Sequence, residues 1–159
     1  MTAPAATTAF SELARELLQH YPRGPVTVAV TGPDAEVTAR VADALGEAAA
    51  ASGRVVARAS ARGDEPDAAR ATIAGFRASG GDVLVVDGPQ LLRPALRGSW
   101  NASVWLEGGA GLEGGAGLEG AALESERAYV RDGDPRSAAS AVLDIADPDR
   151  PVRVFSDSC

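Results

Sequence analysis

The residues from Val26 to Ala39 begin as an apolar run and continue, after a turn, into a helical pattern of apolar positions. This order predicts a buried strand, a tight turn and a helix, the layout of a phosphate-binding loop whose motif Gly-x-x-x-x-Gly-Lys-Ser/Thr would start at Gly32. In such a loop, backbone N–H groups surround the phosphates, the lysine contacts the outer phosphate oxygens and the hydroxyl binds magnesium. The remaining motif positions hold Val37, Thr38 and Ala39. The sequence keeps the frame of the loop without the groups that perform its chemistry.

What remains of a nucleotide site is a small group of residues at this turn: Gly32, Pro33, Asp34 and Thr38. Backbone amides at the start of a helix attract anions even where no lysine is present. However, the carboxylates of Asp34 and Glu36 lie in the same turn, and their charge opposes a polyphosphate. No lysine elsewhere can substitute, because all fifteen Lys/Arg positions are arginine. We therefore expect no cofactor and no metal ion.

Asp87 is the second residue with the type and place to do chemistry. It follows the apolar run Val83–Val86, and a buried strand that ends in aspartate can place a carboxylate where a nucleotide-binding sheet holds magnesium. Many parallel strands end in aspartate for structural reasons. Because the loop upstream lacks its lysine and hydroxyl, we favour a structural strand-end role for Asp87 over metal binding.

The last four residues, Ser-Asp-Ser-Cys at 156–159, form a third candidate site. They resemble the tails of ribosomally made peptides in which a decarboxylated terminal cysteine adds to a dehydrated serine. The resemblance implies modification at Ser156, Ser158 and Cys159 by partner enzymes that recognise the folded part of the chain. The alternative is a frayed tail that ends in cysteine by chance.

The elements that must position these residues alternate between helices and strands along the chain. Helices are expected at 10–20, 35–50 and 67–79, a short helix or turn at 89–97, and strands at 26–30, 54–59, 82–88, 103–106, 141–145 and 152–155. This alternation predicts an α/β fold with a mainly parallel sheet. We expect residues 1–155 to form one domain, with 1–8 frayed, and 156–159 to form an exposed tail.

A glycine-rich repeat interrupts the pattern. The six residues Leu106–Gly111 recur identically at Leu112–Gly117, and the repeat decays by Glu124. Glycine at this density predicts a flexible loop over 106–124. The alanine-rich end, from about Leu118 to Val130, could instead join the next helix.

The composition of the chain limits the classes of molecule that it is expected to bind. The 159 residues suit one domain with a sizeable core, and the net charge of −7 argues against binding nucleic acid or an anionic membrane. There is no membrane-length apolar run and no signal segment, so we expect a cytoplasmic protein. Cys159 is the only cysteine, which excludes disulfides and cysteine metal clusters within one chain. The expected partner is another protein, and a homo-oligomer is also compatible.

Three segments together resemble the uridine-kinase-like family of P-loop nucleoside kinases. They are Val26–Leu45, Val83–Leu106 and Tyr129–Pro151, the last with Asp-Pro-Arg at 134–136 and Asp-Pro-Asp-Arg-Pro at 147–151. The resemblance covers about two thirds of the chain, with the segments in the family's order. It implies a three-layer sandwich around a mainly parallel sheet, with a reduced lid and a reduced nucleoside-binding insertion.

The departures from this family decide the functional hypothesis. The family places an acidic base after its second strand, where this chain has only Asp64 nearby, and the arginine-bearing lid is replaced by the glycine repeat. Phosphoryl transfer depends on positioning and electrostatic stabilisation, so joint loss of lysine, hydroxyl, base and lid arginines removes most of the rate. We expect a catalytically inactive domain that binds a protein or presents its tail. The alternative is a divergent ATP- and magnesium-dependent nucleoside or small-molecule kinase using Asp87 and Asp64.

Overall fold

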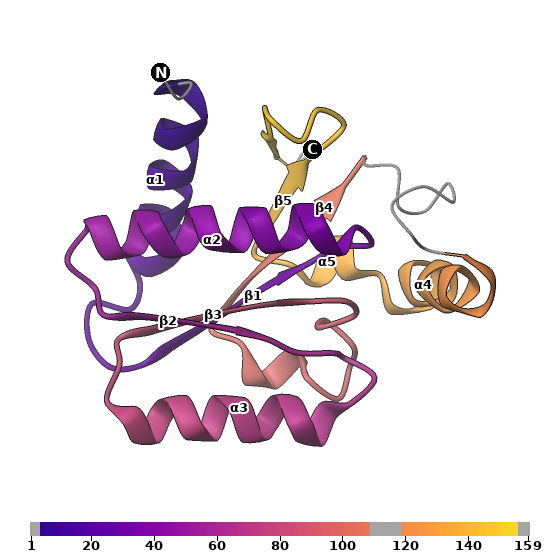
Figure 1. Cartoon of the computed structure of the whole chain (residues 1–159), viewed down its shortest axis with the longest axis horizontal. Helices are drawn as coiled ribbons and strands as arrows, with labels where there is room; N and C mark the ends of the chain where they lie inside the picture. The colour runs from indigo at the N-terminus through magenta and orange to yellow at the C-terminus, as the bar shows by residue number, and fades with distance from the viewer. Residues whose placement is uncertain (1–3, 109–118, 156–159) are drawn as a thin grey trace.

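A six-stranded sheet lies between two layers of helices in the computed structural model, which describes residues 4–108 and 119–155 (Figure 1). The strand order is β2-β3-β1-β4-β5-β6; all neighbours pair in parallel except β6, which is antiparallel to β5. The strands are β1 Val26–Thr31, β2 Val56–Ser60, β3 Val83–Gly88, β4 Ala102–Glu107, β5 Ala141–Asp144 and β6 Val152–Val154. The predicted three-layer α/β fold with a mainly parallel sheet is therefore confirmed.

Helices cover both faces of this sheet. They are α1 Pro4–Leu18, α2 Ala35–Ala51, α3 Pro66–Ser79, η1 Arg97–Ser99, α4 Gly120–Gly133 and α5 Pro135–Ala138. One core cluster joins α1 and α2 to the sheet through residues such as Leu17, Leu45 and Leu106. A second cluster joins α3 to the other face, where Phe76 packs near Leu84. The two faces thus have separate apolar cores with the sheet between them.

β1 is the centre of the sheet because its side chains are buried on both faces. All six of its residues are buried, and it pairs with β3 on one side and β4 on the other. A strand buried on both faces is apolar throughout rather than alternating, which is the pattern of Val26–Val30. The carboxyl end of β1 therefore leads the chain into the candidate turn at the middle of the sheet edge.

Two expectations need correction. The first helix begins at Pro4 rather than Phe10, so the predicted frayed end over residues 1–8 is wrong from Pro4 onward. Alanine is the strongest helix former, and its density here outweighs the polar residues. The expected loop over 106–124 is shorter, because β4 extends through Glu107 and α4 starts at Gly120; residues 109–118 lie outside the described part.

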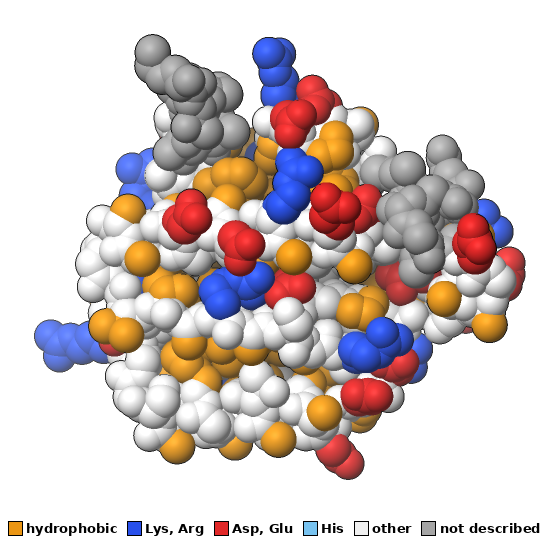
Figure 2. All heavy atoms as spheres, viewed as in Figure 1, with side chains coloured by type: hydrophobic (Ala, Val, Ile, Leu, Met, Phe, Trp, Pro, Cys, Tyr) orange, Lys and Arg blue, Asp and Glu red, His pale blue; other side chains and the backbone are white. Residues whose placement is uncertain are grey.

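The surface mixes charges of both signs. Figure 2 shows acidic and arginine side chains interspersed over the face that carries α2, with apolar side chains in a band between α2 and α3. Among the described residues, the helices are too short or too polar to cross a membrane.

Candidate functional site

The turn after β1 comprises residues 32–34 and is packed against β4. A Cβ atom on Gly32 would lie 2.9 Å from the Cβ of Leu106, closer than side chains tolerate. Pro33, the next residue, is buried as well. Glycine is required here by close approach, and the turn is held near the neighbouring strand.

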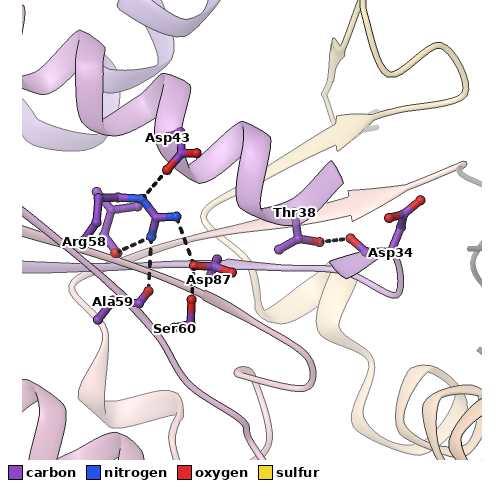
Figure 3. A network of polar contacts seen from close by, with 8 residues as sticks. Asp34, Thr38, Asp43, Arg58, Ala59, Ser60 and Asp87 are labelled. Carbon is purple, nitrogen blue, oxygen red and sulfur yellow. Dashed lines mark hydrogen bonds and ion pairs between the residues drawn. The ribbon is translucent and has the colours of Figure 1, made fainter. Parts of the chain in front are cut away.

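The carboxylate of Asp34 caps α2. Its Oδ1 accepts a hydrogen bond from the backbone N–H of Val37 at 3.1 Å. Its backbone oxygen accepts one from the Thr38 hydroxyl at 2.6 Å (Figure 3). Thr38 is 1% exposed, so its hydroxyl is directed into the helix. An amide in the first turn of a helix is the kind of group that binds phosphate. Here the carboxylate of Asp34 already accepts the hydrogen bond of that amide.

Asp87 lies at the carboxyl end of β3, where the sequence placed it, and is held by the neighbouring strand. Its Oδ1 is 3.0 Å from Nη2 of Arg58 and accepts a hydrogen bond from the Ser60 hydroxyl at 2.8 Å (Figure 3). Its side chain is 10% exposed. A buried carboxylate needs a counter-charge or donors to offset its desolvation, and both contacts come from β2.

Arg58 is the functional neighbour that sequence reasoning missed. Its guanidinium also contacts Asp43 of α2 at 3.0 Å and donates to the backbone oxygens of Ala59 and Val85 at 3.1 and 2.9 Å. Residues two apart in a strand lie on the same face, so Arg58 and Ser60 belong together. An arginine inside an otherwise apolar strand was the available signal.

Asp64 is an exposed residue of the loop between β2 and α3, at residues 61–65. Arg62 holds both of its carboxylate oxygens at 3.0 and 3.1 Å, and this hydrogen bonding lowers the pKa of Asp64. A general base works best with a pKa near the operating pH, so the shift is in the unfavourable direction. Asp64 and Asp87 are each engaged by a different arginine rather than sharing one site.

The loops that follow β2 and β3 touch through their backbones. The Gly63 N–H donates to Pro89 O at 2.9 Å, and a Cβ on Gly63 would lie 1.7 Å from Gln90 O. A Cβ on Gly88 would likewise lie 1.7 Å from Ala61 O. These contacts leave no space between the two loops for a side chain.

A buried polar cluster joins α4 to the loop after β3, and no pattern in the sequence indicated it. Glu126 is 2% exposed; its Oε2 accepts from Gln90 Nε2 at 2.9 Å, and Oε1 has no hydrogen-bond partner among the described residues. The other end of Gln90 accepts two N–H groups of Arg93. Burial raises the pKa of Glu126, against the smaller opposing effects of Gln90 and Arg93.

The remaining predicted site residues belong to the tail at 156–159. Ser156, Ser158 and Cys159 lie outside the described residues. Across residues 4–108 and 119–155, no group of three or more histidine, cysteine, aspartate or glutamate side chains is arranged to hold a metal ion.

Comparison with known proteins supports the fold alone. No protein-family model and no curated protein sequence matches the chain. A solved structure described as a possible uridine kinase from Bacillus stearothermophilus is similar, with a TM-score of 0.66 and 12% identity over 86% of this chain and 98% of that chain. The P-loop-kinase-like fold predicted from the sequence is therefore confirmed, whereas loss of the active site stays a proposal.

Replacing Arg58 with methionine should destabilise the protein by about 2–3 kcal/mol, because Asp87 is left buried without its counter-charge. The measurement is the free energy of unfolding in urea. Arg62→Met breaks an exposed ion pair and should cost less than about 1 kcal/mol. In the double variant Arg58→Met/Asp87→Asn, part of the loss should be recovered; equal losses for Arg58→Met and Arg62→Met would contradict the assigned role.

Glu126→Gln should stabilise the protein more at pH 8 than at pH 5. In the folded protein, the pKa of Glu126 is raised above its ordinary value of 4.5. The stability that the folded protein gains from protonated Glu126 is fully present below pH 4.5 and is lost as the pH rises through the raised pKa. Urea unfolding at both pH values measures the difference. Glu124→Gln, an exposed change on the same helix, should show no such trend. If the difference in the free energy of unfolding between Glu126→Gln and the unchanged protein were the same at both pH values, ionisation of Glu126 would not be its cause.

Proposed function

We propose that this chain is a catalytically inactive kinase-like domain that works by binding another protein. The observation that carries the proposal is the capping of α2 by Asp34, whose carboxylate accepts the Val37 N–H at 3.1 Å. A bound phosphate would have to displace that carboxylate and then lie beside its negative charge. In a working loop, a lysine offsets such repulsion, and this chain contains none.

The Arg58–Asp87 pair adds independent support. A magnesium ion held by Asp87 would be brought to a carboxylate that already has a guanidinium 3.0 Å away. Two cations that share one carboxylate in a partly buried site repel each other. At both of these positions, a charge of this chain has the same sign as the group that a P-loop kinase would bind there.

The sheet edge at β6 offers a surface for a protein partner. Among the described residues, the exposed large apolar side chains are Val55, Val152 and Phe155, and the last two lie on or just after β6. The outer edge of a terminal strand presents backbone N–H and C=O groups without strand partners. A partner that extends the sheet can bind both features.

Calorimetric titration with ATP and magnesium tests the inactive state. We expect no binding tighter than a Kd of about 1 mM, because the phosphate position is occupied by a carboxylate. Micromolar affinity would overturn this part of the proposal. Nucleoside-dependent ATP turnover that disappears in Asp87→Asn would establish the alternative, a divergent nucleoside or small-molecule kinase.

The tail hypothesis is a separate and finer proposal, in which the folded domain presents Ser156, Ser158 and Cys159 to modifying enzymes. Co-expression with a flavoprotein decarboxylase and a lyase that act on such tails should then lower the intact mass by water and by the terminal carboxyl group. Cys159→Ser is the matched control and should lose the decarboxylation. An unchanged mass with both enzymes active would contradict this proposal and leave the inactive domain untouched.

A further inference from the structure

A cavity of about 470 Å³ lies between α1 and the end of α2, where α1 stands over that helix (Figure 1). Its lining includes Ala14, Arg15 and Leu18 of α1, Ala48 and Ala51 of α2, and Arg54. These residues lie where α2 ends and the chain approaches the amino end of β2. The turn at residues 32–34 lies at the start of α2, beyond the carboxyl end of β1. The cavity therefore lies at the opposite end of the parallel strands. Its volume is within the range of small-molecule sites.

Two arginines in this cavity have no carboxylate partner. The guanidinium of Arg15 has no hydrogen bond or ion pair with any residue that the structure describes. Arg54 donates one hydrogen bond, from Nη2 to Tyr21 O at 3.0 Å, and its other N–H groups have no acceptor within the described ranges. That bond fixes the guanidinium while leaving donors free. Guanidinium groups with free N–H donors bind oxyanions such as carboxylates.

The acidic residues of α1 are directed away from the cavity. Glu12 and Glu16 line a different groove, beside β5 and β6, where Glu16 holds Arg153 through contacts of 2.8 and 2.9 Å. No carboxylate lines the cavity between α1 and α2. In a chain with a net charge of −7, this makes it a locally positive site.

The floor of the cavity is apolar, which favours a ligand whose uncharged part is also apolar. Ala14 and Leu18 are buried, and Ala48 and Ala51 complete the wall from α2. A ligand that uses both parts needs an anionic head for the arginines and an apolar body for the floor. We infer that this cavity binds a small monocarboxylate with a short aliphatic body. The inference concerns a separate site and does not rest on the proposed function.

An arginine near the end of a helix also has a simpler role, because positive charge there complements the helix dipole. Arg77 provides the comparison. It lies in the last turn of α3 as Arg15 does in the last turn of α1, it is exposed, and it is not part of this cavity. Removal of Arg77 changes the charge of the protein by the same amount, so it separates a local site from general electrostatics.

The test is a titration of the ¹⁵N-labelled full chain with hexanoate, followed by amide chemical shifts. Hexanoate should give saturable shifts at Ala14, Ala48 and Ala51, and hexanamide, which has the same body without the charge, should give none. Arg15→Gln and Arg54→Gln should each weaken hexanoate binding by about tenfold, because each removes a charge-assisted hydrogen bond. Arg77→Gln should leave the affinity unchanged.

Three results would overturn the inference. Equal affinity for hexanoate and hexanamide would mean simple apolar adsorption. Equal weakening by Arg15→Gln and Arg77→Gln would mean a general charge effect. Inorganic phosphate binding as tightly as hexanoate at the same amides would remove the role of the apolar floor. Arg15 is exposed, so its variant is expected to fold, and the dispersion of its amide spectrum verifies this.

Discussion

The guanidinium of Arg58 is the interaction on which the carboxyl edge of the sheet depends. It joins three elements, because from β2 it contacts Asp43 on α2 and both Asp87 and the backbone oxygen of Val85 on β3. A carboxylate that is 10% exposed is costly unless a counter-charge and donors accompany it. With Arg58 in place, Asp87 can remain inside the fold without a metal ion. The strand-end carboxylate is thereby part of the framework.

The first turn of α2 follows the same principle at a second position. In the P-loop arrangement, positive groups of the protein face negative groups of the ligand. Here Asp34 supplies the negative charge to the helix terminus, and the buried hydroxyl of Thr38 donates to the backbone of that same residue. The two sites lie on neighbouring strands, β1 and β3, and each satisfies its own polar groups. A nucleotide would have to break both arrangements before it gained any contact, which is why we propose an inactive domain rather than a weakened enzyme.

The parts of this structure that follow from sequence are those dictated by burial and local backbone preferences. The short, mostly apolar runs that end at Val30 and Val86 predict strands buried on both faces, and the apolar stripe along α2 predicts its inner side. Arg58 could not be assigned, because its partner is separated from it by twenty-nine positions and the register Ser60↔Asp87 was unknown. Glu126 was hidden for a different reason: nothing in an otherwise polar helix marks one glutamate as buried.

The two ends of the parallel strands differ in whether their charged side chains have partners within the fold. At the carboxyl edge, Asp34 and Asp87 have partners within the fold, and the loops that follow β2 and β3 meet backbone to backbone. At the opposite edge, Arg15 and Arg54 line a cavity without a carboxylate. Arg15 is exposed and Arg54 is half-buried, and both keep N–H donors without an acceptor among the described residues, so the capacity that we infer for an anion lies at this second end. The inactive kinase-like site that we propose and the separate anion cavity that we infer are compatible in one domain, since they use opposite ends of α2.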